Sequence, residues 1–136
     1  KETLQNLGVG SIAFTPLAQG MLTKKYLGGI PQGSRASQGK SLFPSMLTEN
    51  AVENIKKLNE IAIGRDQTLA QMAIAWVLRD GGITTALIGA SKASQVIDCV
   101  GAVNNLEFTA GELAQIDKYA DEEQINLWAA SAEQDA

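Results

Sequence analysis

Two short runs without a charged residue, SIAFTPL at 11–17 and ITTALI at 83–88, constrain the fold most strongly. Both are rich in β-branched and aliphatic residues, and each is bounded by glycine or proline, which is typical of buried strands. The second run has the profile of a parallel strand that is covered on both faces. Because helices are predicted between them, the two strands are expected to run parallel in a βαβ unit of an α/β fold.

Hydrophobic residues at helical spacing predict two helices between these strands. In TENAVENIKKLNEIAIGRD, the apolar residues share one face, with Glu and Lys on the other. In TLAQMAIAWVLRD, Thr68 and Gln71 form the spacing of a capping box, which predicts a helix that starts at Leu69. Ahead of the first strand, residues 1–7 resemble the end of a helix that Gly8 closes.

The sequence after the second strand also predicts helices. One is expected from about Ala93 to Val103, and a second is capped by Thr109 with Glu112. The final residues are acidic, although Leu127 and Trp128 are apolar enough to dock. From Ala18 to Met46 the composition is loop-like, and a connection this long is usually functional or disordered.

The outer edges of the predicted sheet indicate that it is part of a larger sheet. Two parallel strands leave both outer edges unpaired, and these edges are apolar. The chain has 136 residues and is 45% hydrophobic, which suffices for one hydrophobic core. Its sequence starts at Lys1 with residues that resemble the later part of a helix. We therefore expect the sheet to be completed by residues outside this chain or by a partner.

Composition excludes several classes of function. A net charge of −4 gives no reason to expect a nucleic-acid partner, and no apolar run approaches the roughly 20 residues that span a membrane. The single cysteine, Cys99, excludes an internal disulfide and fits a cytoplasmic location. The absence of histidine removes the commonest general acid–base and the commonest zinc ligand.

The turn after the second strand, in TALIGASKASQ, has the ingredients of an anion site. Gly89 frees the backbone at the strand end, and Ser91 is expected to cap the following helix. The first N–H groups of a helix carry partial positive charge, which suits a phosphate. The other interpretation is a plain strand–turn–helix junction with an exposed Lys92, and the spacing alone leaves both open.

The end of the first strand favours the phosphate interpretation. TPLAQG, residues 15–20, follows that strand at what should be the same edge of the sheet. Lys24, Lys25 and Arg35 follow in the loop, and cations beside a helix N-terminus suit a ligand with more than one phosphate. For the Lys24–Lys25 pair, a solvated basic pair is the competing interpretation.

Three segments together, FTPLAQGMLTKKY, GIPQGSRAS and TLAQMAIAWVLRDGGITTALIGASKASQ, resemble the aldo-keto reductases. The resemblance is closest to the branch that holds potassium-channel β-subunits and bacterial L-glyceraldehyde 3-phosphate reductases, and ELAQID followed by NLW resembles the bacterial members. It implies that residues 1–136 are the C-terminal part of one (β/α)8 TIM barrel, strands 7 and 8 with their helices, incomplete as a barrel.

The resemblance also implies an NADP(H) site. Residues 15–19 would line the nicotinamide and pyrophosphate, Lys25 and Arg35 would meet the phosphates, and Gly89 with Ser91 would hold the adenosine 2′-phosphate. Gln95 and Asp98 would approach the adenine and its ribose, although the family usually has Glu and then Asn where this chain has Asp98 and Cys99. The implied cofactor-binding residues are Thr15, Pro16, Leu17, Ala18, Gln19, Lys25, Arg35, Gly89, Ser91, Gln95 and Asp98.

The family's catalytic Asp-Tyr-Lys-His tetrad has no counterpart in this chain. Neither Tyr26 nor Tyr119 matches the tyrosine position, so the chain alone is expected to be inactive, while the complete enzyme would reduce a small aldehyde or ketone. Its expected partner is the missing N-terminal half of the barrel. The alternatives are a non-catalytic half-barrel that senses NADP(H) or binds a partner, and a chain that associates with itself through its open strand edges.

Overall fold

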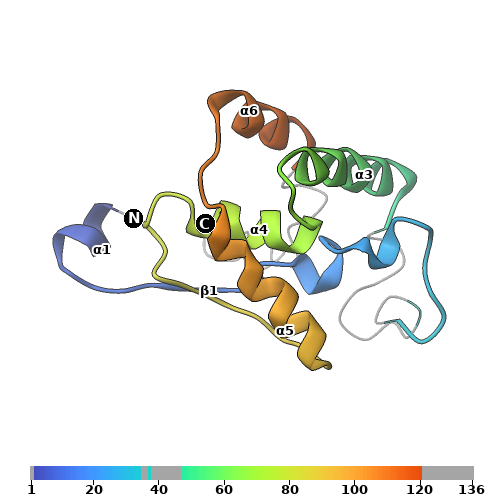
Figure 1. Ribbon diagram of the computed structural model, residues 1–136, viewed down its shortest axis with the longest axis horizontal. Helices are drawn as coiled ribbons and strands as arrows, with labels where there is room; N and C mark the ends of the chain where they lie inside the picture. Colours follow the sequence, from blue (N-terminus) through green and yellow to red (C-terminus); the bar gives the residue numbers. More distant parts are fainter. Residues whose placement is uncertain (1, 35–36, 38–46, 121–136) are drawn as a thin grey trace, which may run out of the picture.

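The computed structural model describes residues 2–34, 37 and 47–120, arranged as a two-stranded sheet with helices around it (Figure 1). The helices and strands are α1 (Glu2–Asn6), β1 (Ile12–Phe14), α3 (Glu49–Gly64), α4 (Leu69–Leu78), β2 (Thr85–Leu87), α5 (Ala93–Val100) and α6 (Ala110–Tyr119). Single 3-10 turns are η1 (Ala18–Gly20), η2 (Lys24–Tyr26) and η4 (Gly101–Asn104). Arg35, Leu127 and Trp128 lie outside the described residues. No helix among the described residues is long and apolar enough to cross a membrane.

The two strands pair in parallel, as the sequence predicts. Ile12 lies opposite Thr85 and Phe14 opposite Leu87. At the amino ends of the strands, the Thr84 and Thr85 N–H groups donate to the Ser11 carbonyl oxygen at 3.0 and 3.1 Å. The Ser11 N–H donates in return to the Thr84 hydroxyl at 2.9 Å. These bonds fix the register, so the carboxyl ends of both strands lie at one edge of the sheet.

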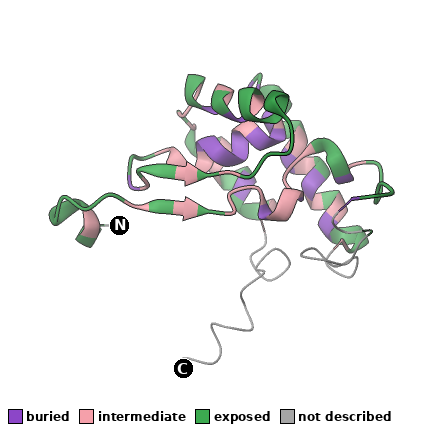
Figure 2. Ribbon diagram, turned by 90° about the horizontal axis from the view of Figure 1, so that it is seen from below, coloured by how far each residue is buried: buried purple, intermediate pink, exposed green. Residues whose placement is uncertain are grey.

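One face of the sheet is uncovered, so the prediction that the second strand is covered on both faces is wrong for this chain. Ala86 packs with residues of α4, α5 and η4 in a small apolar cluster. On the opposite face Ile12, Phe14 and Leu87 are 68%, 62% and 62% exposed (Figure 2). All helices that reach the sheet in the described part pack against its other side, which leaves these three side chains in water.

The predicted helix starts are confirmed by their caps. Thr68 and Thr109 form reciprocal capping boxes with Gln71 and Glu112. At the start of α3, where no cap was predicted, the Thr48 hydroxyl accepts a hydrogen bond from the Ala51 N–H. The helix expected from Ala93 to Val103 ends as an α-helix at Val100 and continues as the 3-10 turn η4.

The glycine that closes the first helix is also confirmed. Gly8 has φ +65°, its N–H donates to the Gln5 carbonyl, and the Val9 N–H donates to the Leu4 carbonyl. This pair of bonds is a Schellman motif, which requires the left-handed conformation that glycine adopts without steric cost.

The main core lies between α3, α4 and α6, away from the sheet (Figure 1). The loop after β1 contributes to it, because Met21 and Tyr26 are 0% and 1% exposed. The first half of the loop-like region is therefore ordered, and two buried side chains hold its turns against the helices. The sequence did not predict this, because glycines and prolines surround both residues.

Candidate functional site

The carboxyl ends of β1 and β2 form one edge of the sheet, where two turns lie next to each other. Phe14 and Leu87 are paired at the last position of the two strands, so Thr15 and Ile88 are the first residues beyond the sheet. Parallel α/β sheets bind ligands at this edge, because the loops that follow the strands converge there. The structure thus brings together the two turns that the sequence predicted to share a site.

The turn after β1 has an unusual backbone. Thr15, Ala18 and Gln19 have φ of +58°, +45° and +59°, the left-handed region that non-glycine residues rarely occupy. The Ala18 N–H donates to the Thr15 carbonyl at 3.0 Å, and the Gly20 N–H donates to the Leu17 carbonyl at 2.8 Å. Each such residue costs on the order of 1–3 kcal/mol, and such strain clusters at functional sites. The buried Met21 anchors the turn against the core.

Three donors converge on one point at the turn after β2. Gln95 Oε1 accepts hydrogen bonds from the Ser91 N–H at 2.8 Å, the Ser91 hydroxyl at 3.2 Å and the Lys92 N–H at 3.2 Å. A Cβ added at Gly89 would meet nothing within 4 Å, so the approach to the turn is open. Two amides and a hydroxyl around one acceptor oxygen form a donor set that suits a phosphate oxygen.

The prediction that Ser91 caps the following helix is wrong. Helix α5 begins at Ala93, so Lys92 occupies the capping position. Lysine has no acceptor atom, so its side chain cannot cap the helix. The side chain of Gln95, from inside the helix, reaches back and accepts from the Ser91 and Lys92 N–H groups, which precede the first helical residue. Ser91 is therefore a donor in this turn rather than an acceptor.

The Asp98 side chain contacts the start of another helix of the same chain. Both its carboxylate oxygens lie 3.2 Å from the Thr68 hydroxyl at the start of α4, and the Gln71 Nε2 donates to the Asp98 backbone oxygen at 2.9 Å. These contacts join α5 to the start of α4. The neighbouring Cys99 is buried, and burial, followed by the charge of Asp98, raises the pKa of its thiol. Cys99 is thus a neutral core residue.

The predicted cationic residues are placed only in part. Lys24 and Lys25 are exposed on η2, in the loop that follows the left-handed turn. The Lys25 Nζ lies 5.8 Å from the centroid of the Tyr26 ring. Arg35 lies outside the described residues, so its predicted phosphate contact stays a prediction. No group of three or more metal-ligating side chains occurs in the described ranges.

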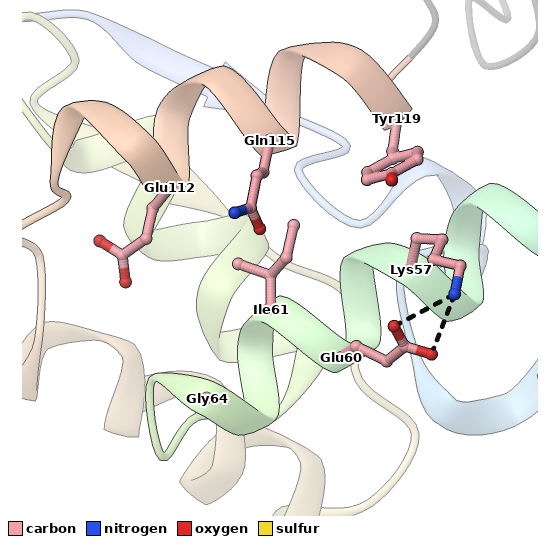
Figure 3. A pocket seen from close by; sticks show the side chains of 7 residues that line it. All are labelled: Lys57, Glu60, Ile61, Gly64, Glu112, Gln115 and Tyr119. Carbon is pink, nitrogen blue, oxygen red and sulfur yellow. Dashed lines mark hydrogen bonds and ion pairs between the residues drawn. The ribbon is translucent and has the colours of Figure 1, made fainter.

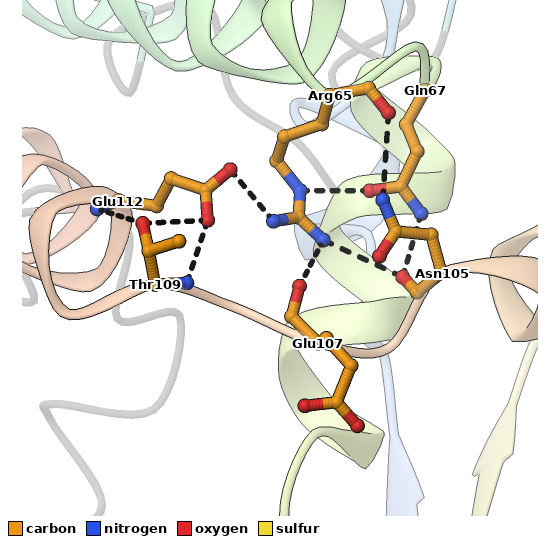
Figure 4. A network of polar contacts seen from close by, with 6 residues as sticks. All are labelled: Arg65, Gln67, Asn105, Glu107, Thr109 and Glu112. Carbon is orange, nitrogen blue, oxygen red and sulfur yellow. Dashed lines mark hydrogen bonds and ion pairs between the residues drawn. The ribbon is translucent and has the colours of Figure 1, made fainter.

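A buried arginine that no sequence pattern marked joins the end of α3 to the segment before α6 (Figure 4). The Arg65 side chain is 3% exposed and its Nη1 lies 2.9 Å from Glu112 Oε1. Its Nε donates to Gln67 Oε1 at 2.9 Å, its Nη2 donates to the Glu107 carbonyl at 2.8 Å, and its guanidinium lies 3.6 Å from the Phe108 ring centroid. This network fixes the end of α3 to the start of α6.

The Glu112 carboxyl is held in its charged form by the same network. Partial burial of the carboxyl opposes ionisation, but hydrogen bonds from the Thr109 N–H and hydroxyl and from Arg65 outweigh it and lower its pKa. The signal in the sequence was the Thr109–Glu112 spacing, which predicted the cap but not the arginine.

A groove of about 450 Å³ lies between α3 and α6 (Figure 3). It is lined by charged and polar side chains that include Lys57, Glu60 and Gln115. The Lys57 Nζ lies 3.3 Å from a Glu60 carboxylate oxygen, so these two charges satisfy one another. The groove lies on the far side of the helices from the strand edge and offers no unpaired charge to a ligand.

Comparisons with known proteins show the family of this chain. The sequence model of the Aldo/keto reductase family matches residues 1–121. The chain belongs to the aldo/keto reductase family. It is 52% identical to the L-glyceraldehyde 3-phosphate reductase of Escherichia coli K12 and 51% identical to that of Escherichia coli O157:H7. Each alignment covers 97% of this chain and 39% of the relative, so the chain spans about two fifths of the length of these relatives.

Membership of the aldo/keto reductase family is consistent with the open sheet. The family fold is a TIM barrel, and the described part of the chain has two parallel strands, which is consistent with an incomplete barrel. In a closed barrel the inward-pointing side chains of all strands pack together in layers. Ile12, Phe14 and Leu87 are large apolar residues on the uncovered face, as an inner barrel face requires.

Proposed function

We propose that this chain is the cofactor-holding, C-terminal portion of an NADP(H)-dependent aldo-keto reductase, with β1 and β2 as strands 7 and 8. The complete enzyme reduces a small aldehyde, of the glyceraldehyde 3-phosphate kind, or a ketone. The observation that carries this proposal is the pairing of the strained Thr15 turn with the donor-rich Ser91 turn at one edge of the sheet. The relatives' names support the substrate class.

The residues of the two turns fit the proposed cofactor. The Ser91 N–H and hydroxyl and the Lys92 N–H would hold the adenosine 2′-phosphate, with Gln95 moving aside or turning to the adenosine. Thr15, Pro16, Leu17, Ala18 and Gln19 would line the nicotinamide and pyrophosphate. When bound, the cofactor supplies the hydride that reduces the carbonyl carbon. The left-handed turn would hold the nicotinamide ring in one orientation, because internal hydrogen bonds fix the backbone of the turn.

Proton donation is assigned to polypeptide outside this chain. The sequence has no histidine, and its two tyrosines are Tyr26 and Tyr119. Tyr26 is 1% exposed in the core, and Tyr119 lines the groove between α3 and α6. A general acid must reach the carbonyl oxygen within hydrogen-bond distance. Neither tyrosine is at the strand edge, so this chain alone is expected to be inactive.

Selective loss of NADP+ binding tests the assignment of Ser91. We expect Ser91→Ala to weaken NADP+ binding about tenfold or more and to leave NAD+ binding unchanged, because a hydrogen bond to a charged group contributes about 1.5–3 kcal/mol. Calorimetric titration would use a chimera in which this chain replaces the matched 39% of the E. coli K12 relative.

Ser94→Ala is the matched control, because Ser94 is an exposed serine in the first turn of the same helix. It should leave both affinities unchanged. Equal loss of NADP+ and NAD+ binding in Ser91→Ala would contradict the phosphate assignment.

The alternative is a half-barrel that senses NADP(H) without catalysis, or one that pairs with a second copy of itself. The uncovered Ile12, Phe14 and Leu87 face is the observation that favours self-association. Sedimentation of the chain at several concentrations distinguishes these proposals. A dimer that binds NADP+ tightly would support the alternative. A monomer that binds NADP+ weakly would support the proposal that the chain is a portion of a larger barrel.

A further inference from the structure

An apolar groove of about 700 Å³ opens between α4, α3, α6 and the turn after β1. Its floor is made of helix side chains, among them Leu58, Met72 and Ile116, which are 3%, 3% and 5% exposed. Its walls include Trp76 and Val77 of α4. A groove of this volume with a mostly apolar lining, to which Thr15 and Asp117 add polar atoms, is the kind of concavity that binds several apolar side chains.

A segment of the chain itself begins at the rim of this groove. Ala120 lines the groove, and residues 121–136 follow it directly. Their sequence is DEEQINLWAASAEQDA, in which Ile125, Leu127 and Trp128 are the large apolar residues. Acidic residues flank them on both sides, so INLW at 125–128 is a short apolar stretch in a polar surrounding.

The groove also contains a hydrogen-bond donor without a partner. The Trp76 Nε1 is buried and has no partner among the described residues, although Arg79 stacks on the indole with its guanidinium 3.8 Å from the ring centroid. A buried donor without an acceptor destabilises the folded state. A peptide segment in the groove would bring carbonyl oxygens that can accept this bond.

We propose that residues 125–128 dock into this groove as a C-terminal strap. Ala120 and Trp128 are eight residues apart, and at about 3.3 Å per residue an extended connection reaches roughly 26 Å, enough to place INLW anywhere along the groove. Attachment through a short linker gives the segment an effective concentration in the millimolar range. A separate protein or a second copy would have to compete with that concentration.

Docking would connect the C-terminal segment to the strand edge. Phe14, Thr15 and Pro16 line the same groove, so INLW would pack beside the left-handed turn. Burial of one tryptophan removes about 150–250 Å² of surface from water. The docking itself does not depend on the proposed cofactor.

Disulfide trapping in the full 136-residue chain tests the strap. In a Cys99→Ala background, Val77→Cys in the groove is combined with Asn126→Cys, which keeps the three apolar residues of the segment. We expect an intramolecular disulfide, identified by peptide mapping, in a fraction at least tenfold above that of the control pair Glu53→Cys with Asn126→Cys, since Glu53 is exposed on α3. Disulfides between chains, or a yield equal to the control, would overturn the proposal in favour of another occupant.

A second measurement serves if the cysteine variants fold poorly. In ¹⁵N-labelled chain, Trp128→Ala is expected to shift the indole N–H resonance of Trp76 and to speed its exchange with solvent, because the acceptor leaves the groove. Ile63→Ala, a change at an exposed residue of α3, should leave that resonance in place. An unchanged Trp76 resonance in Trp128→Ala would contradict docking.

Discussion

Arg65→Ala is expected to lower the free energy of unfolding of the chain by about 3 kcal/mol, since loss of one partner of a buried pair typically costs 3–5 kcal/mol. The upper part of that range does not apply, because the Glu112 side chain is 27% exposed and water can solvate it. The loss also leaves Gln67 Oε1 and the Glu107 carbonyl without their donor. Urea unfolding followed by circular dichroism measures the change.

Lys56→Ala is the control for this variant. The Lys56 Nζ lies 3.8 Å from Glu53, and the two side chains are 48% and 58% exposed. Exposed pairs at this spacing contribute about 0.3–0.5 kcal/mol, so the unfolding midpoint should hardly change. If both substitutions lower the free energy of unfolding equally, the buried Arg65 network contributes no more to stability than an exposed ion pair.

The same network predicts a specific pH dependence. The pKa of Glu112 is lower in the folded chain than its unfolded value of about 4.3, so its ionised form stabilises the fold above that value. This contribution is lost as the pH falls through the folded pKa. The difference in unfolding free energy between the unmodified chain and Glu112→Gln should therefore be constant from pH 7 to 5 and shrink below pH about 4. A difference that grew on acidification would contradict the assignment.

Phe14→Asp is expected to reduce carbonyl turnover by the chimera at least about a hundredfold while leaving the isolated chain folded. In this chain Phe14 is 62% exposed, so an aspartate there meets water. In a closed barrel the same position points into the packed interior, where an unpaired carboxylate costs several kcal/mol. The comparison requires turnover of the chimera and circular dichroism of the isolated chain.

Ile63→Asp is the matched control, because Ile63 is also 62% exposed but lies on α3, away from the sheet. Turnover should survive this substitution. If the two aspartate variants lose turnover equally, the uncovered face of the sheet is not the inner face of a barrel.

Most of the helix and strand assignments could be predicted from local sequence patterns. Thr68 and Thr109 cap helices where the capping pattern places them, because a cap is decided by residues within one turn. The parallel pair also followed from the sequence, since two strands joined through helices have few other arrangements. The prediction that both sheet faces are covered was wrong. An apolar strand sequence is suited to burial in a complete barrel, but it does not show whether this chain alone supplies the covering residues.

Long-range polar contacts escaped the sequence analysis. Arg65 meets Glu107 and Glu112 across more than forty positions, and no local pattern marks such a partner. Ser91 does not cap the helix, because the long side chain of Gln95 reaches back over the turn and accepts hydrogen bonds from the Ser91 N–H and hydroxyl. The position of the two turns after β1 and β2 at one edge of the sheet was predictable from strand order, whereas the hydrogen bonds of these turns depend on side-chain geometry that periodicity does not record.

Reduction of glyceraldehyde 3-phosphate with NADPH, measured side by side for the isolated chain and for the chimera, tests the central claim most directly. We expect oxidation of NADPH by the chimera and none above background by the 136 residues alone, because the proposed function assigns cofactor binding to the strand edge and proton donation to other polypeptide, and the chain has no histidine. Turnover by the isolated chain would contradict it.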